Sequence, residues 1–212
     1  MRFIIHEQPF ERILAAGQYR YEQDGRPTGA LEHWRLTAVH EPYQFLRVDL
    51  DGRPASGNSY LYHLTVGENG RPERLQYRFW GNGLTISGNV LLELETIMAT
   101  RQVNGRTDEE VVTLPTDYCF AFPSVTGLGW LTRQMGGRER GTAVLLNPTV
   151  DQPENAFKLM VTDLTLARGA ALTLRWPGQA RTLWLDEQDW PVRMERGGDG
   201  LTAVAMRYTI YQ

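Results

Sequence analysis

The chain has 212 residues, of which 42% are hydrophobic and 22% charged, a mixture typical of globular proteins that excludes a disordered chain. The 22 basic and 25 acidic residues give a net charge of −3, and no basic run supplies a positive surface, so we expect no nucleic-acid partner. No apolar run reaches the roughly 20 residues of a membrane-spanning helix, and the single cysteine excludes an intramolecular disulfide.

Tight-turn signals are the clearest local feature of the sequence. Six Asp-Gly or Asn-Gly pairs lie at 24–25, 51–52, 69–70, 82–83, 104–105 and 199–200. Such pairs accept the positive φ angles of hairpin turns. Between them apolar and polar residues alternate, as where Leu75, Tyr77 and Phe79 are separated by single polar residues. A period of two predicts an antiparallel sheet with one polar face.

We expect strands at 12–23, 29–39, 43–50, 57–67, 73–81, 84–103, 109–114, 141–149, 157–168, 170–176, 181–186, 191–196 and 201–211. The stretch 84–103 must break or bend, near Gly88 or around Leu94. Pro27, Pro54 and Pro72 follow three of the turns, and because proline cannot donate to a ladder, each should start a strand or lie outside the pairing. No shift in composition marks a linker, so residues 1–212 are interpreted as one domain.

One segment, residues 115–137, departs from the strand pattern. Ser124 can cap a helix that runs to Met135, and Gly136 and Gly137 would end it. Apolar residues recur within it at helical spacing. We therefore expect a helical plug or lid on the sheet near 118–137, and we expect Trp130 to pack into the hollow of the sheet.

Motifs for metal or cofactor chemistry are absent from the sequence. The four histidines form no His-Glu-x-x-His pattern, and no Cys-x-x-Cys is present, so we expect no metal site. No glycine-rich phosphate loop precedes a helix, so we expect no nucleotide cofactor. Cys119 lies between Tyr118 and Phe120, where a small buried hydrophobic residue is the simpler interpretation than a nucleophile.

Two carboxylates leave an enzymatic alternative open. Glu93 and Glu95 share a face if their stretch is a strand, and leucines surround them. An apolar environment raises the pKa of a carboxyl, as acid–base catalysis requires. A hydrolase or isomerase could use these residues with Arg101 or a histidine, although a solvated strand face also explains them.

Aromatic residues are the remaining candidates for a binding site. A concave apolar pocket would form where rings gather on strands and in the helical segment. The candidate ligand-binding residues are Trp34, Tyr60, Tyr62, Tyr77, Phe79, Trp130, Trp176 and Trp184. Rings pack well in sheets, so most of these should simply fill the core, and ligand contact is the second role open to each.

Two short patterns resemble a known family. The segments 182–186 (TLWLD) and 191–195 (PVRME) form the closest stretch, and 17–21 (GQYRY) with 25–29 (GRPTG) fits an opening hairpin. With the long β-meander and the apolar helical insertion, they resemble bacterial half-barrel proteins related to lipoprotein-localisation carriers and to putative glycolipid-binding domains. The resemblance implies an all-β fold: a large curved antiparallel sheet, a half-barrel or open barrel, with one or two short helices and an acyl or glycolipid ligand on its concave face.

The sequence departs from these carriers at its start. It shows neither a secretion signal nor a lipobox cysteine there, because His6 and Glu7 interrupt the first apolar residues. We therefore expect a cytoplasmic protein. Three functions are open: non-catalytic binding of a lipid or other apolar ligand, the enzyme described above, and a structural or interaction domain with a filled core.

Overall fold

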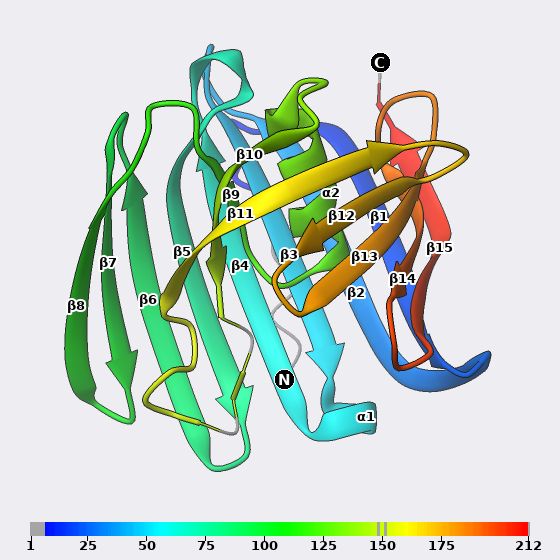
Figure 1. Ribbon diagram of the computed structural model, residues 1–212, viewed down its shortest axis with the longest axis horizontal. Coiled ribbons are helices and arrows are strands. Elements are labelled where there is room, and N and C mark those ends of the chain that lie inside the picture. The colour runs from blue at the N-terminus through cyan, green and yellow to red at the C-terminus, as the bar shows by residue number, and fades with distance from the viewer. Residues whose placement is uncertain (1–6, 148, 151, 212) are drawn as a thin grey trace.

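The computed structural model describes residues 7–147, 149–150 and 152–211. Strands make up 62% of the chain and helices 9%, which confirms the predicted all-β class. The strands of the described residues form one large sheet that curves without closing (Figure 1). Two residues named in the predictions lie outside the described residues: His6, which interrupts the first apolar residues, and Pro148, within the strand expected at 141–149.

The sheet contains β1 (Arg12–Gln23), β2 (Arg26–Ala38), β3 (Gln44–Gly52), β4 (Asn58–Val66), β5 (Pro72–Gly81), β6 (Leu84–Leu92), β7 (Thr96–Val103), β8 (Arg106–Thr113), β9 (Cys119–Ala121), β10 (Arg140–Leu146), β11 (Leu159–Arg168), β12 (Leu172–Trp176), β13 (Gln179–Leu185), β14 (Pro191–Arg196) and β15 (Leu201–Ile210). The helical elements of the described residues are α1 (Arg53–Ser56), the 3-10 turn η1 (Glu68–Gly70) and α2 (Val125–Met135). None of these helices is long and apolar enough to cross a membrane.

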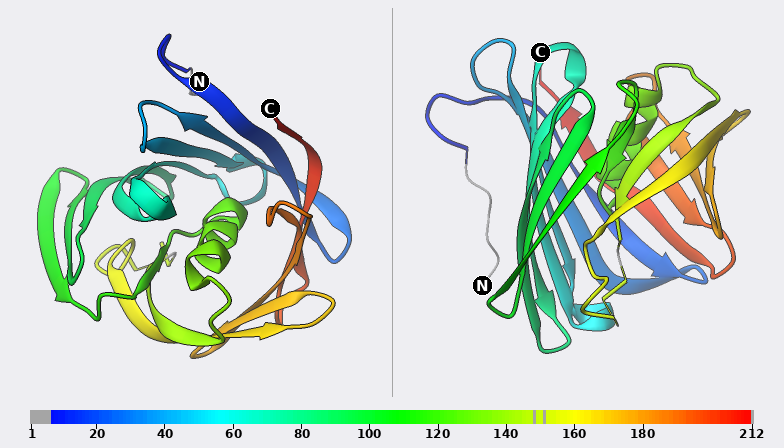
Figure 2. Two further views of the ribbon diagram at one scale, coloured as in Figure 1. Left: turned by 90° about the horizontal axis from the view of Figure 1, so that it is seen from above. Right: turned by 60° about the vertical axis from the view of Figure 1, so that its left-hand side comes forward.

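The strand order brings the two ends of the described chain together. From β1 the sheet runs in chain order to β8, and on the other side of β1 it runs from β15 back to β9. Neighbouring strands are antiparallel except β9 and β10, which are parallel. Seen from above, the sheet curls around α2 (Figure 2). The predicted open half-barrel with a short helix on its concave face is confirmed.

The expected break within 84–103 lies around Leu94, where three residues separate β6 from β7. Gly88 is not a break, because it lies within β6 opposite Tyr77. A Cβ atom at Gly88 would lie 2.3 Å from the Tyr77 ring, so the missing side chain makes room for that ring. Gly17 on β1 makes room for Trp34 in the same way, because a Cβ atom at Gly17 would lie 2.6 Å from the indole ring.

Two of the three turn prolines follow the prediction, and one does not. Pro72 starts β5 and Pro54 lies in α1, outside the ladder. Pro27 is paired with Glu22 inside β2, next to a shift in register. The hydroxyl of Thr28 donates a hydrogen bond of 3.0 Å to the Tyr21 carbonyl, which links the two strands beside this shift in register.

Several local features differ from the predicted strands; β2 begins at Arg26 rather than at 29, and β10 ends at Leu146 rather than at 149. Strand β9 was not expected, since three residues beside β10 carry no recognisable alternation. Strand β8 begins at Arg106, directly after its tight turn, rather than at 109. Strand β11 begins at Leu159 rather than at 157, because Phe157 adopts a left-handed φ of 59° and turns inward.

Candidate functional site

The N-terminus of α2 is fixed to the sheet by Glu32, a fully buried residue of β2. Its carboxylate accepts hydrogen bonds from the backbone N–H groups of Val125 (3.0 Å) and Thr126 (2.9 Å). The hydroxyls of Thr126 and Tyr21 donate two more, both at 2.6 Å. A negative charge is favourable beside the exposed N–H groups of a helix N-terminus. Burial raises the pKa of Glu32, and these hydrogen bonds oppose that rise.

The bounds of α2 agree with the sequence. Ser124 accepts a hydrogen bond of 2.8 Å from the Gly127 N–H, and Gly136 ends the helix with a φ of 54°. Of its 11 residues, 9 are buried. Gly129 allows α2 to approach the start of β14 closely, since a Cβ atom at position 129 would lie 2.5 Å from the Pro191 ring.

A row of indole rings connects α2 to the sheet. Trp130 of α2 is 4% exposed, and its ring centroid lies 6.3 Å from that of Trp190. Trp190 stacks on Trp34 of β2 at 4.2 Å. The guanidinium of Arg133 covers the outer side of Trp190 at 4.1 Å. Trp130 is therefore part of the core inside the curved sheet, as expected from the sequence.

Residues 152–158 fill another part of the concave face. The buried ring of Phe157 stacks on Tyr77 of β5 with a centroid distance of 4.9 Å. Arg101 of β7 is 7% exposed and donates hydrogen bonds to the Glu154 carbonyl, at 3.1 Å, and to neighbouring carbonyls of the same segment. Around Tyr77 and Arg101 the concave face is thus closed by protein side chains.

An apolar cavity of about 520 Å³ remains beside the N-terminal half of α2. Its walls come from both arms of the curved sheet, from α1 and from α2. Most lining side chains are apolar; they include Leu50, Phe122, Leu128, Leu146, Met160 and Met194. Among the described residues that line the cavity, the charged ones are two arginines, and none is acidic. This size and lining are typical of small-molecule sites.

The two arginines are Arg181 on β13 and Arg196 on β14, directly opposite each other in the ladder. The guanidinium of Arg181 lies 5.2 Å from the centre of the Trp176 ring and donates hydrogen bonds to the Ala180 carbonyl, at 2.8 Å, and to the side-chain oxygen of Gln179, at 2.7 Å. Burial and the positive charge of Arg196 lower the pKa of Arg181 to about 10. Arg196 forms an ion pair with Asp199.

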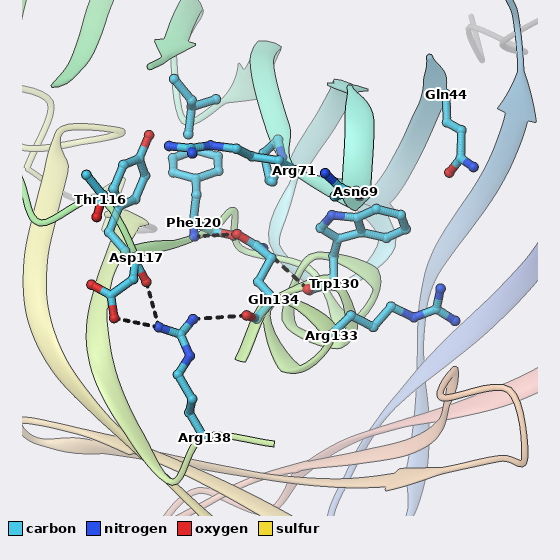
Figure 3. Close-up of a pocket in the computed structure, with 14 residues that line it drawn as sticks. Gln44, Asn69, Arg71, Thr116, Asp117, Phe120, Trp130, Arg133, Gln134 and Arg138 are labelled. Atoms are coloured by element: carbon cyan, nitrogen blue, oxygen red, sulfur yellow. Dashed lines mark hydrogen bonds and ion pairs between the residues drawn. The ribbon is translucent and has the colours of Figure 1, made fainter. Parts of the chain in front are cut away.

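A second cavity, of about 400 Å³, lies at the C-terminal half of α2 (Figure 3). Its arginines already have partners. Arg138 binds the Asp117 carboxylate at 2.8 Å and the Gln134 carbonyl at 3.0 Å, as the dashed lines in Figure 3 show. Arg71 and Arg133 donate to backbone carbonyls at 2.9 and 2.6 Å. The contacts of Arg133 and Arg138 hold loops to α2, and that of Arg71 joins two loops, which indicates a structural role for this polar cavity.

A third hollow, of about 590 Å³, lies on the outer face of the sheet over β3 to β8. Polar side chains such as Gln76 and Asn89 line it. Arg47 at its edge binds the Glu11 carboxylate at 2.6 Å. Burial and the Arg47 charge lower the pKa of His63 in this groove to about 4. Its polar lining makes this outer groove a poor site for an apolar molecule.

The eight rings singled out from the sequence lie in different places. Tyr60 and Trp176 line the apolar cavity. Trp130 lines the polar cavity of Figure 3. Four rings are buried in the core and line neither of these two cavities: Trp34, Tyr62, Tyr77 and Phe79. Trp184 follows the fully buried Leu183 along β13 and so points to the outer face, where it contacts Arg193 at 5.3 Å.

The carboxylate pair of the enzymatic alternative is not on a strand. Glu93 and Glu95 both lie in the turn between β6 and β7, and both are exposed. They therefore share no strand face and occupy no apolar pocket. Cys119 is fully buried, and burial raises the pKa of its thiol, as expected for a core residue. No group of three or more potential metal ligands occurs within the part of the chain that the structure describes.

Three residues of these sites carry no role in the prediction from the sequence: Glu32, Arg181 and Arg196. Glu32 lies 93 residues from Val125, and no local pattern links the two. A signal for Arg181 was available, because it alternates with Leu183 along β13 and so belongs on the inner face. No family model matches the sequence, and no curated protein or solved structure is significantly similar to it. The resemblance to half-barrel carriers stays a prediction.

Proposed function

We propose that the protein binds a lipid or another apolar small molecule, without catalysis, in the apolar cavity between α2 and the concave face of the sheet. The cavity itself carries the proposal. Its volume of about 520 Å³ lies within the roughly 300–1,000 Å³ of small-molecule sites, and its lining is mainly apolar.

The contrast within one sheet supports this proposal. Beside Tyr77 and Phe79 of β5, Phe157 fills the concave face, as close packing in a protein interior requires. Next to β13 and β14 the same face keeps an open volume that apolar residues surround. Close packing of a structural core explains the first region. It does not explain why an open apolar volume remains in the second.

Binding of the neutral apolar dye N-phenylnaphthylamine tests the proposal. The purified protein should bind the dye saturably, with one site per chain, and extraction into organic solvent followed by mass spectrometry should recover apolar molecules that copurify. Ala55 of α1 is exposed and lines the cavity, so it marks the mouth. Ala55→Trp should weaken dye binding about ten-fold or more, since a large ring there obstructs entry.

Ala167→Trp is the matched control. Ala167 is an exposed residue of β11 next to the buried Leu166, so its side chain points away from the concave face. This variant should bind the dye as the unchanged protein does. Absence of saturable binding, or equal binding by the Ala55→Trp protein, would contradict the proposal.

A further inference from the structure

We infer that the ligand is an anionic amphiphile whose acyl chain occupies the apolar cavity and whose carboxylate or phosphate head group lies between Arg181 and Arg196. The inference rests on the proposed function, because it names the chemical class of molecule that the cavity holds. Four observations carry it: the register of the two arginines, the unused donors of Arg196 and Trp176, the charge of the cavity lining, and the position of the pair at the cavity edge.

The register places two like charges directly opposite each other. Arg181 pairs with Arg196 two positions from the buried pair of Leu183 and Met194. Side chains two positions apart share a face, so both arginines point to the concave side. Like charges that face each other across an antiparallel pair are destabilising. An anion bound between the two guanidinium groups removes this repulsion.

Donors beside the cavity have no acceptor within the described chain. The Nε–H of Arg196 and the indole N–H of Trp176 are buried and have no hydrogen-bond partner among the described residues. Both residues line the cavity. Buried N–H groups normally find an acceptor, and an oxyanion at this place is an acceptor of suitable chemistry.

The charge of the lining favours a negative head group. Among the described lining residues Arg181 and Arg196 are the charged ones, and Asp199 beside them offsets a single positive charge. One positive charge remains for the ligand, which matches a carboxylate. A cationic head group would meet repulsion here, and a neutral one would leave the charge unpaired.

The position of the pair fits an amphiphile rather than a free anion. The side chain of Arg196 is 40% exposed, so a head group beside it stays in contact with water. The lining continues from the arginines to Met194, Leu201 and Leu128, which are apolar. A molecule with one charged end and one apolar chain therefore matches both parts of the cavity.

Displacement of N-phenylnaphthylamine by three competitors tests the inference. The competitors are palmitate, hexadecanol and hexadecyltrimethylammonium, each kept below its critical micelle concentration. Palmitate should bind about ten-fold or more tightly than hexadecanol, since charge-assisted hydrogen bonds add to the same apolar burial. The ammonium compound should bind more weakly than hexadecanol. Added salt should weaken palmitate binding and leave hexadecanol binding unchanged.

Arg181→Gln and Arg196→Gln should each weaken palmitate binding about ten-fold and lower the preference for palmitate over hexadecanol measured on the same variant, and circular dichroism shows that each variant is folded. Arg175→Gln is the control, because Arg175 is an exposed residue of β12 outside the cavity lining. If Arg196→Gln fails to fold, Arg181→Gln and the salt dependence of the unchanged protein decide the result.

The outcomes separate this inference from the proposed function. If the dye binds but palmitate and hexadecanol compete equally, or if the arginine variants bind palmitate normally, the head-group inference is overturned and apolar binding stands. If neither the dye nor any competitor binds, both are overturned. Palmitate binding that depends on both arginines and on low salt supports both.

Discussion

Replacement of Glu32 by glutamine tests how α2 is held against the sheet. One carboxylate oxygen accepts from Tyr21 and Val125, and the other accepts from both donors of Thr126. The glutamine oxygen can keep two of these bonds, but its NH₂ group must face the two remaining donors. Hydrogen bonds to a charged group contribute about 1.5–3 kcal/mol each, so we expect Glu32→Gln to lower the free energy of unfolding by about 3–5 kcal/mol.

Urea denaturation measures this loss, and hydrogen exchange at the Val125 and Thr126 amides should show faster opening of the first turn of α2. Glu195→Gln is the control, because its ion pair with Arg193 is 40–50% exposed and such pairs contribute about 0–1 kcal/mol. A Glu32→Gln protein within about 1 kcal/mol of the control would refute the assignment of Glu32 as the anchor of α2.

Three further predictions concern the core and the outer groove. Trp130→Ala should lower the free energy of unfolding by about 3–5 kcal/mol in urea denaturation, as for a buried aromatic; little loss together with higher dye uptake would instead identify a movable lid. Gly129→Ala should destabilise by about 1–3 kcal/mol despite the better helix propensity of alanine, because the Cβ would lie 2.5 Å from Pro191; unchanged or higher stability would show that α2 can shift. The pKa of His63 is lowered from 6.5 to about 4, so its neutral form favours folding: its contribution is full above pH 6.5 and is lost, by up to about 3 kcal/mol, as the pH falls to 4. His63→Gln should flatten the stability profile over that range, and an unchanged slope would contradict it.

The fold class was predictable because its signals are local. Asp-Gly and Asn-Gly pairs mark hairpins within a few residues, and alternation along strands such as β5 marks the inner face. The helix α2 was predictable for the same reason, since Ser124 and Gly136 flank it directly. The meander topology then follows, because most neighbours in the sheet are also neighbours in sequence.

The site was less predictable because its contacts are long-range. Ring-bearing strands indicated a concave pocket, but Phe157 lies 80 residues from Tyr77 and fills the part of the hollow where several of the candidate rings lie. The charged edge of the remaining cavity depends on the register of β13 and β14, and a shift of one residue between them would have put the two arginines on opposite faces. The register of two strands depends on the pairing of the whole sheet, and no short sequence pattern predicts it.

Photo-crosslinking with a palmitate that carries a diazirine on its chain tests the central claim most directly, since the carbene inserts into the side chains that the bound chain touches. After irradiation and peptide mapping, we predict attachment to residues that line the apolar cavity, such as Leu146 and Met160, and loss of labelling in the Ala55→Trp protein. Attachment confined to the outer groove around His63, or to the polar cavity of Figure 3, would contradict the assignment of the apolar cavity as the ligand site.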